Sequence, residues 1–382
     1  MTSTTDRMSE ARSLVRKPYD FTVKEAAGKT HIPGLNGMRA IAVMLVIIAH
    51  YGFQDVVPGG LGVTIFFFIS GFLICTLLLR EQEKSGTIAI KAFYVRRFLR
   101  LAPEMYVFVG LTALYFFVRG VPVELGRAFA AVAYWMNYYK IFNLSSEGSG
   151  IHWGHLWSLA VEEHFYLTFP LLVLALVKVP KRLMLLLTII LIVCPIYRAF
   201  TLIENFPGHY TYYASEARAD SLAYGCLLAC LARYSEGAVA LFRRFANPAL
   251  PLGILVLLAT LVLRNEFFRE TIRYSLQGIG IGMIFIGLYY GSLGPVLLEW
   301  LETPIADWLG KLSYAIYLWH FILLNVIDME FGVADMRALP MGQHLLLTAV
   351  MTVISIALAQ ASYLLVYQNF VRLRRNWGSH AA

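Results

Sequence analysis

Apolar runs long enough to cross a lipid bilayer alternate with short polar segments along almost the whole chain. A hydrocarbon layer about 30 Å thick needs about 20 residues of helix, so this pattern predicts an all-α bundle of membrane helices. The runs lie at 36–54, 61–79, 101–118, 125–141, 157–177, 183–200, 218–233, 249–264, 274–291, 311–329 and 343–368.

The run at 125–141 is not expected to cross the bilayer fully. It contains Arg127 and ends in the aromatic stretch Tyr-Trp-Met-Asn-Tyr-Tyr-Lys, a composition typical of an interfacial or re-entrant element on the outer side. With the other ten runs as spans, 23 of the 32 Lys and Arg residues fall on the side of the N-terminus. Such an excess marks the cytoplasmic side. We therefore expect about ten transmembrane helices in the plasma (inner) membrane, with both termini cytoplasmic.

The composition agrees with one integral membrane domain. The chain is 58% hydrophobic and 15% charged, whereas soluble domains rarely exceed about half apolar. We expect a polar cytoplasmic tail at 1–32, a membrane domain at 33–370 and a basic cytoplasmic tail at 371–382. The net charge of +8 follows from this sidedness, and no nucleic-acid partner is expected. All four cysteines lie in apolar runs, which favours small buried side chains over disulfides or a metal site.

Two histidines lie within apolar runs. Ten apolar residues separate Arg39 from His50, so a helix would place His50 about 16 Å along the axis from Arg39. If Arg39 marks the inner edge of the hydrocarbon layer, His50 lies near or just beyond the midplane, where an ionisable side chain usually has a function. A helix-end histidine, or one bonded to a neighbouring helix, is the alternative. For His320, in the run 311–329, the alternative is a satisfied core histidine.

Three arginines, Arg96, Arg97 and Arg100, lie where the third run begins, on the expected cytoplasmic side. Arg97 and Arg100 are three residues apart and share a helix face. Two guanidinium groups on one face can bind phosphate oxygens through paired hydrogen bonds. Ordinary anchoring by positive charges at the cytoplasmic surface is the alternative.

A second polar group is expected at the outer ends of the fourth and sixth spans. Ser158 and Glu162 are four residues apart, and Glu163 follows directly. Two adjacent carboxylates are costly at a membrane face, which favours a function. Arg218 and Asp220 form a similar pair, for which a structural ion pair is the alternative.

Several motifs follow one another over residues 33 to about 370, and as an ordered set they resemble the membrane acyltransferase-3 family of integral membrane O-acyltransferases. The resemblance implies a ten-helix bundle that moves an acyl group, usually acetyl, from an acyl-CoA inside the cell to a hydroxyl, often on a sugar, presented from outside. The motifs are Pro33-Gly-Leu-Asn-Gly-Met-Arg39-Ala-Ile-Ala-Val, Gly59-Gly60 with Gly71-Phe72-Leu-Ile, Phe93-Tyr-Val-Arg-Arg97-Phe-Leu-Arg100 with Pro103, His155-Leu-Trp-Ser-Leu-Ala-Val-Glu-Glu163-His-Phe-Tyr166, Arg218-Ala-Asp220-Ser-Leu-Ala-Tyr-Gly225 and Leu309-Gly-Lys-Leu-Ser-Tyr-Ala-Ile-Tyr-Leu-Trp-His320.

The chemistry of such a transfer suggests roles for these residues. A sugar hydroxyl needs a base near neutral pH, and histidine suits that task. We expect His50 to be this base, with Glu162 or Glu163 fixing its tautomer or holding the hydroxyls of the acceptor. Whether transfer is direct or passes through an acyl-histidine stays open. The expected acyl-CoA site is Arg96, Arg97 and Arg100, and the remaining candidates, substrate-binding or structural, are Arg39, Ser158, Arg218, Asp220 and His320.

The expected partners are acetyl-CoA or another acyl-CoA as co-substrate, a glycan or other hydroxyl acceptor, and the lipid bilayer. No permanently bound cofactor and no metal are expected, and the oligomeric state stays open. Acylation of a small secreted product, such as a macrolide or glycolipid, is the alternative within the enzyme class. A proton-coupled transporter could also use intramembrane His, Glu and Arg, but the sequence lacks an inverted repeat. A non-catalytic membrane scaffold would not need the polar clusters.

Overall fold

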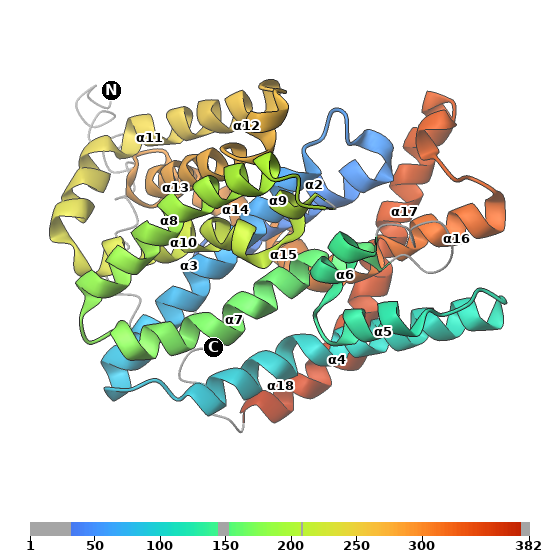
Figure 1. Ribbon diagram of the computed structural model, residues 1–382, viewed down its shortest axis with the longest axis horizontal. Helices are drawn as coiled ribbons and strands as arrows, with labels where there is room; N and C mark the ends of the chain where they lie inside the picture. The colour runs from blue at the N-terminus through green and yellow to red at the C-terminus, as the bar shows by residue number, and fades with distance from the viewer. Residues whose placement is uncertain (1–31, 144–152, 208, 376–382) are drawn as a thin grey trace, which may run out of the picture.

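The computed structural model describes residues 32–143, 153–207 and 209–375, and every regular element in these ranges is helical. The polar tail expected at 1–32 lies almost wholly outside them, as does the end of the basic tail. The elements, shown in Figure 1, are α2 (Leu35–Ile48), the π-helical turn η1 (Ala49–Phe53), α3 (Gly59–Ser85), α4 (Ile90–Val118), α5 (Leu125–Val132), α6 (Met136–Phe142), the 3₁₀ turn η3 (Gly154–Leu156), α7 (Trp157–Leu176), α8 (Pro180–Ile203), α9 (Tyr210–Tyr213), α10 (Ser215–Tyr234), α11 (Glu236–Val262), α12 (Glu266–Glu270), α13 (Arg273–Tyr290), α14 (Gly294–Leu301), α15 (Pro304–Trp319), α16 (Ile322–Phe331), the 3₁₀ turn η4 (Met336–Ala338), α17 (Met341–Ser362), the π-helical turn η5 (Tyr363–Tyr367) and α18 (Gln368–Arg375).

Seven helical stretches in the described ranges are long and apolar enough to cross a membrane. The number rises to nine if α13 with α14, bent by 103°, and α15 with α16, bent by 48°, each count as one span. The expected count of ten is therefore not confirmed. The expected span at 218–233 corresponds to α10, which has 20 residues and buries several polar side chains.

The segment 125–141 forms two short helices instead of one long one. Helices α5 and α6 have eight and seven residues, so each is about 12 Å long or less and cannot cross a 30 Å layer. Tyr134, between them, has a φ of 53°, which breaks the helical path. In Figure 1 the two helices lie beside one end of α4, and α5 packs against α4.

Helices α3 and α10 cross at the centre of the bundle with their backbones in close approach. A Cβ atom on Gly71 would lie 2.0 Å from the carbonyl oxygen of Leu222, and one on Gly225 would lie 2.1 Å from that of Phe68. Small residues at such crossings let membrane helices pack closely. This crossing holds α10, with its polar side chains, in the interior of the molecule.

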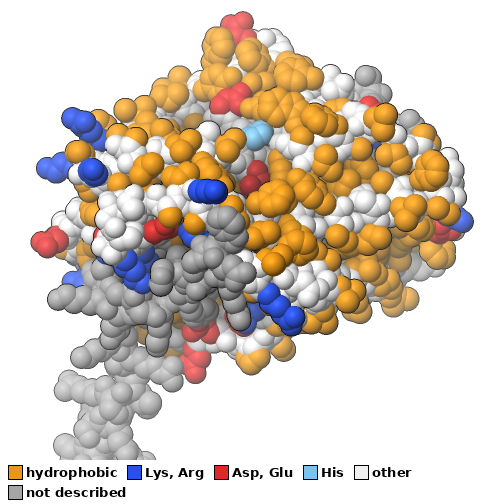
Figure 2. Space-filling view, turned by 90° about the horizontal axis from the view of Figure 1, so that it is seen from below, with side chains coloured by type: hydrophobic (Ala, Val, Ile, Leu, Met, Phe, Trp, Pro, Cys, Tyr) orange, Lys and Arg blue, Asp and Glu red, His pale blue; other side chains and the backbone are white. Residues whose placement is uncertain are grey.

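The outer surface of the bundle is largely apolar. Figure 2 shows hydrophobic side chains over most of one face, with most of its visible Lys and Arg side chains in the left half. Large aliphatic and aromatic side chains are exposed along α4, α8, α11 and α17, as expected where helices contact lipid tails.

Candidate functional site

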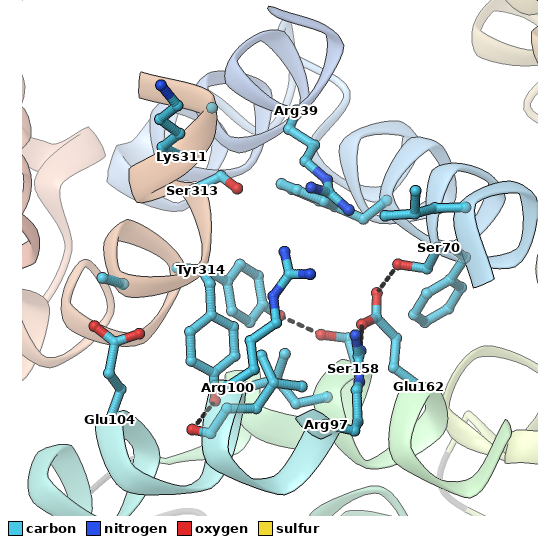
Figure 3. Close-up of a pocket in the computed structure, with 18 of the residues that line it drawn as sticks. Arg39, Ser70, Arg97, Arg100, Glu104, Ser158, Glu162, Lys311, Ser313 and Tyr314 are labelled. Carbon is cyan, nitrogen blue, oxygen red and sulfur yellow. Dashed lines mark hydrogen bonds and ion pairs between the residues drawn. The ribbon is translucent and has the colours of Figure 1, made fainter. Parts of the chain in front are cut away.

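A narrow cavity of about 250 Å³ lies between α2, α3, α4, α7, α15 and η5. Its polar lining is rich in arginine. In Figure 3, Arg39 from α2 and Arg100 from α4 extend toward each other across it, with Glu162 and Ser158 of α7 beside them. The cavity therefore gathers residues that the sequence analysis assigned to two separate groups.

Arg97 is already paired with carboxylates in the narrow cavity. Its guanidinium nitrogens lie 3.7 Å from a carboxylate oxygen of Glu162 and 3.4 Å from one of Glu163. Its Cζ lies 3.4 Å from the ring centroid of Tyr166. Glu162 also accepts hydrogen bonds from Ser70 at 3.1 Å and from the Tyr166 hydroxyl at 3.2 Å. The expectation that these glutamates orient His50 is thus not met by the geometry, because their partner is Arg97.

The other arginines expected at a phosphate site differ in position. Arg100 lines the narrow cavity, and so does Arg39, which forms no ion pair with any described carboxylate. Arg96 does not line it and instead pairs with Glu81 at 3.2 Å. Apart from Arg97, the cationic lining of the narrow cavity therefore consists of Arg39 and Arg100, with Lys311 at one edge.

A second, wide cavity of about 630 Å³ contains His50 in its lining. It is enclosed by η1 and the following loop, the start of α3, the C-terminal end of α11 and the N-terminal end of α13. Single residues of α7, α9, α12 and α15 complete the lining. His50 lies in η1, where Gly52 has a φ of 93° and the chain leaves the helix. Single π-helical turns often occur at functional sites. Here the turn ends the helix with the His50 side chain at the cavity.

His50 is hydrogen-bonded to His320, at the end of α15. Nδ1 of His50 lies 3.1 Å from Nε2 of His320, and Nδ1 of His320 lies 2.7 Å from the carbonyl oxygen of Tyr317. A carbonyl oxygen only accepts, so Nδ1 of His320 carries the proton that it donates. In a neutral ring Nε2 of His320 then accepts from Nδ1 of His50. This arrangement leaves the lone pair of His50 on Nε2, where a base needs it.

Two residues, Val63 and Tyr317, line both cavities, and we call this pair the partition. The Tyr317 hydroxyl donates to the carbonyl oxygen of His155 at 2.7 Å. It also lies 2.7 Å from the hydroxyl oxygen of Ser158. Ser158 lines the narrow cavity, whereas its neighbour Trp157 lines the wide one. The partition is therefore about one side chain thick.

Comparison with known proteins shows the family to which this chain belongs. A family model described as "Acyltransferase domain" matches residues 32–360. The chain belongs to the acyltransferase-3 family. Peptidoglycan O-acetyltransferase OatA of Listeria monocytogenes is 30% identical over 319 residues, which are 78% of this chain and 50% of that protein. Putative peptidoglycan O-acetyltransferase YrhL of Bacillus subtilis is 31% identical over 365 residues, 87% of this chain and 54% of that protein. A putative O-acetyltransferase of Staphylococcus aureus, SACOL0978, is 30% identical over 309 residues, 78% of this chain and 51% of that protein.

This acyltransferase chain spans about half the length of the curated relatives it matches. No solved structure matches it.

The ion pair considered for Arg218 and Asp220 has a different partner. Asp220 binds Arg198 of α8 through two hydrogen bonds of 3.0 and 2.8 Å, with both side chains fully buried. Arg218 contacts the Thr64 hydroxyl at 3.1 Å and lies over the ring of Tyr274, with its Cζ 4.0 Å from the centroid. The alternative considered for these two residues, a structural ion pair with each other, is therefore not seen, because Asp220 is paired with Arg198 instead.

Sequence reasoning missed Tyr317, which lines both cavities, and two buried residues that line neither, Arg198 and His155. Arg198 is an ionisable residue inside an apolar run, the signal that drew attention to His50. Tyr317 lies one helical turn before His320 in the same motif. His155 lies beside His320, with 5.5 Å between the ring centroids, and its Nε2 bonds the Leu318 carbonyl oxygen at 3.1 Å. Its position at the start of a quoted motif could have marked it.

Proposed function

We propose that this protein is an integral membrane O-acetyltransferase that moves acetyl from cytoplasmic acetyl-CoA to a sugar hydroxyl of a cell-surface or exported glycan. The observation that carries the proposal is the pair of cavities meeting at one thin partition. One cavity presents arginines suited to phosphate, and the other presents a histidine suited to act as a base. Two substrates approaching from opposite sides of a bilayer need such an arrangement.

The narrow cavity would receive the donor. Phosphate groups of CoA carry several negative charges, and arginine binds them through paired hydrogen bonds. Arg39 and Arg100 supply these donors, while Arg97, held between Glu162 and Glu163, shapes the wall. A volume of about 250 Å³ is smaller than that of a whole CoA molecule. The thioester arm would therefore enter toward the partition, with the nucleotide end nearer the cytoplasm.

The wide cavity would receive the acceptor. Nε2 of His50 accepts the proton of the sugar hydroxyl as its oxygen bonds to the acetyl carbon. The carbon–sulfur bond of the thioester then breaks, and the departing thiolate takes this proton from His50, so that CoA leaves as the thiol. His320 acts through His50 by holding the tautomer with the lone pair on Nε2. It is a positioning residue in this scheme, and it takes the place that the sequence analysis gave to the glutamates.

A glycan acceptor is favoured over a small secreted product by two observations. The matched relatives are described as peptidoglycan O-acetyltransferases. The wide cavity is also lined by the aromatic side chains of Trp157, Tyr212 and Tyr274, a residue type on which the C–H faces of sugar rings pack. A transporter would not need a histidine base in one cavity and a separate arginine-lined cavity on the other side of the partition.

Membrane vesicles of known orientation test the proposal. Inside-out vesicles given acetyl-CoA with a ¹⁴C-labelled acetyl group should accumulate base-labile label on glycan, and sealed right-side-out vesicles should not. His50→Gln should lower the rate 10²–10⁴-fold, because that is the usual contribution of a positioned base. Arg119→Gln, in an ion pair with Glu330 away from both cavities, is the matched control. Normal labelling by His50→Gln overturns the mechanism, and label found only in a soluble small product overturns the glycan acceptor.

A further inference from the structure

Three arginines, Arg264, Arg269 and Arg273, line the wide cavity. They come from the loop after α11, from α12 and from the start of α13. The only carboxylate in the same lining is that of Asp55. The glutamates of the same segment, Glu266 and Glu270, do not line the cavity, and Glu270 accepts a hydrogen bond from Thr211. The charge facing the cavity is therefore positive.

These arginines differ from others on the same expected side of the membrane. Nine of the 32 Lys and Arg residues lie on the side opposite the N-terminus in the ten-span arrangement. In the described part of the chain, none of the three cavity arginines forms an ion pair. By contrast, ion pairs join Arg119 with Glu330, Arg127 with Glu124, Arg198 with Asp220, and Arg337 with Asp335.

Two buried guanidinium nitrogens near the cavity also lack partners among the described residues. Nε of Arg273 and Nε of Arg218 are both buried, and neither makes a hydrogen bond. Arg218 is 0% exposed, and it lies behind the cavity wall against the rings of Tyr212 and Tyr274, which line the cavity. A buried cation without a carboxylate is costly. An anion in the cavity would offset this cost.

We propose that the wide cavity binds an anionic acceptor, a sugar carrying a carboxylate or phosphate group, whose charge is held by Arg273 with Arg269 and Arg264. This inference rests on the proposed function, because it assigns the acceptor class to the site of His50. The charged group would dock at the arginines while the sugar ring lies on the aromatic wall. That docking would fix which hydroxyl reaches Nε2 of His50.

Binding without turnover tests the acceptor class. The full-length protein, in nanodiscs of the zwitterionic lipid phosphatidylcholine, is titrated with three soluble probes. N-Acetylmuramic acid carries a carboxylate, its methyl ester is the neutral match, and N-acetylglucosamine 1-phosphate carries a phosphate. At least one anionic probe should bind about tenfold or more tightly than the ester, since hydrogen bonds to charged groups contribute that much. Its affinity should fall as salt is added. Equal binding of all three probes overturns the proposal.

Variants locate the anion within the cavity. Arg273→Gln should weaken the preferred anionic probe about tenfold and leave the ester unchanged, with a smaller effect for Arg269→Gln, which is more exposed. Arg119→Gln, which removes a paired cation elsewhere, should bind the probes as wild type does. Arg273→Lys keeps the charge but not the paired donors and should fall between wild type and Arg273→Gln. Undiminished anion binding in both Arg273 variants overturns the assignment.

Two further measurements separate this inference from its neighbours. Nanodiscs containing the anionic lipid phosphatidylglycerol should leave probe binding intact, whereas its loss there means that the arginines hold lipid headgroups and overturns the proposal. The His50→Gln protein should still prefer the anionic probe. If the protein prefers the anionic probe but the wild type transfers no acetyl group, the proposed function is overturned and the acceptor-binding site is not. Transfer by wild type without any preference for the anion overturns the acceptor class alone.

Discussion

The arginines of the narrow and wide cavities differ in how far the protein itself balances their charge. In the narrow cavity Arg97 lies between two glutamates and against an aromatic ring, so most of its charge is balanced within the protein. In the wide cavity Arg264, Arg269 and Arg273 have no carboxylate partner among the described residues. An internal ion network fixes a shape, whereas unpaired arginines leave hydrogen-bond donors for a ligand. Counting arginines alone would not separate Arg97, whose charge is balanced by Glu162 and Glu163, from the arginines of the wide cavity.

The contacts of Glu162 and Glu163 also show that a sequence motif does not reveal which residue it contacts. The carboxylates of the Glu162-Glu163 motif lie within 4 Å of Arg97 and not at His50. His50 has a second histidine as its partner instead. The spacing within each motif predicts which residues share a helix face, but the partner of that face comes from another part of the chain.

The largest expected effect is all-or-none thiol labelling, which tests whether the two cavities face opposite sides of the membrane. We expect a cysteine at Lys181, at the start of α8, to be cytoplasmic and one at Asp335, before α17, to be outside. In intact cells an impermeant thiol reagent should then label Asp335→Cys and spare Lys181→Cys. The four native cysteines are buried and should give little background. The reverse labelling pattern would invert the donor and acceptor sides.

Loss of the His320 contact should have the next largest effect. His320→Leu removes the acceptor for Nδ1 of His50, and we expect acetyl transfer to fall roughly 10- to 100-fold, less than for loss of the base itself. His320→Asn keeps a side-chain oxygen that can accept from Nδ1 and should recover part of the rate. Turnover rate and its pH profile are the measurements. If the two variants behave alike, His320 has only a packing role.

The smallest expected effects separate Arg39 from Arg97 in the narrow cavity. Arg39→Gln should raise the KM for acetyl-CoA several-fold with little change in thermal stability. It removes a group that donates hydrogen bonds to phosphate, and it leaves no carboxylate unpaired. Arg97→Gln should mainly lower the melting temperature, since it leaves Glu162 and Glu163 buried without their partner. Michaelis kinetics and thermal unfolding in detergent give both values. An unchanged KM in Arg39→Gln would remove that residue from the donor site.

The sequence predicted the helical class and most helix positions because apolar runs of about 20 residues have few other solutions in a membrane. It also predicted that 125–141 would not form a full span, and this segment forms two short helices. Tertiary partners were harder to predict. Arg198 and Asp220 are 22 residues apart on different helices, and no periodicity within one helix indicates such a pair. The cavity arginines 264, 269 and 273 are spread over a loop and two helices, so they form no linear motif.

The thin partition at Tyr317 has a consequence for the energetics of the cell. In the proposed arrangement one cavity opens to each side of the membrane, and the proton and ion gradients across that membrane depend on what separates the two cavities. Here the separation is Val63 with a tyrosine whose hydroxyl is tied to Ser158 and to the His155 backbone. An apolar acyl arm can pass beside such side chains more easily than a hydrated ion, which would have to shed its water. In the proposed function, the residues at which donor and acceptor meet would therefore also block the passage of ions between the two sides of the membrane.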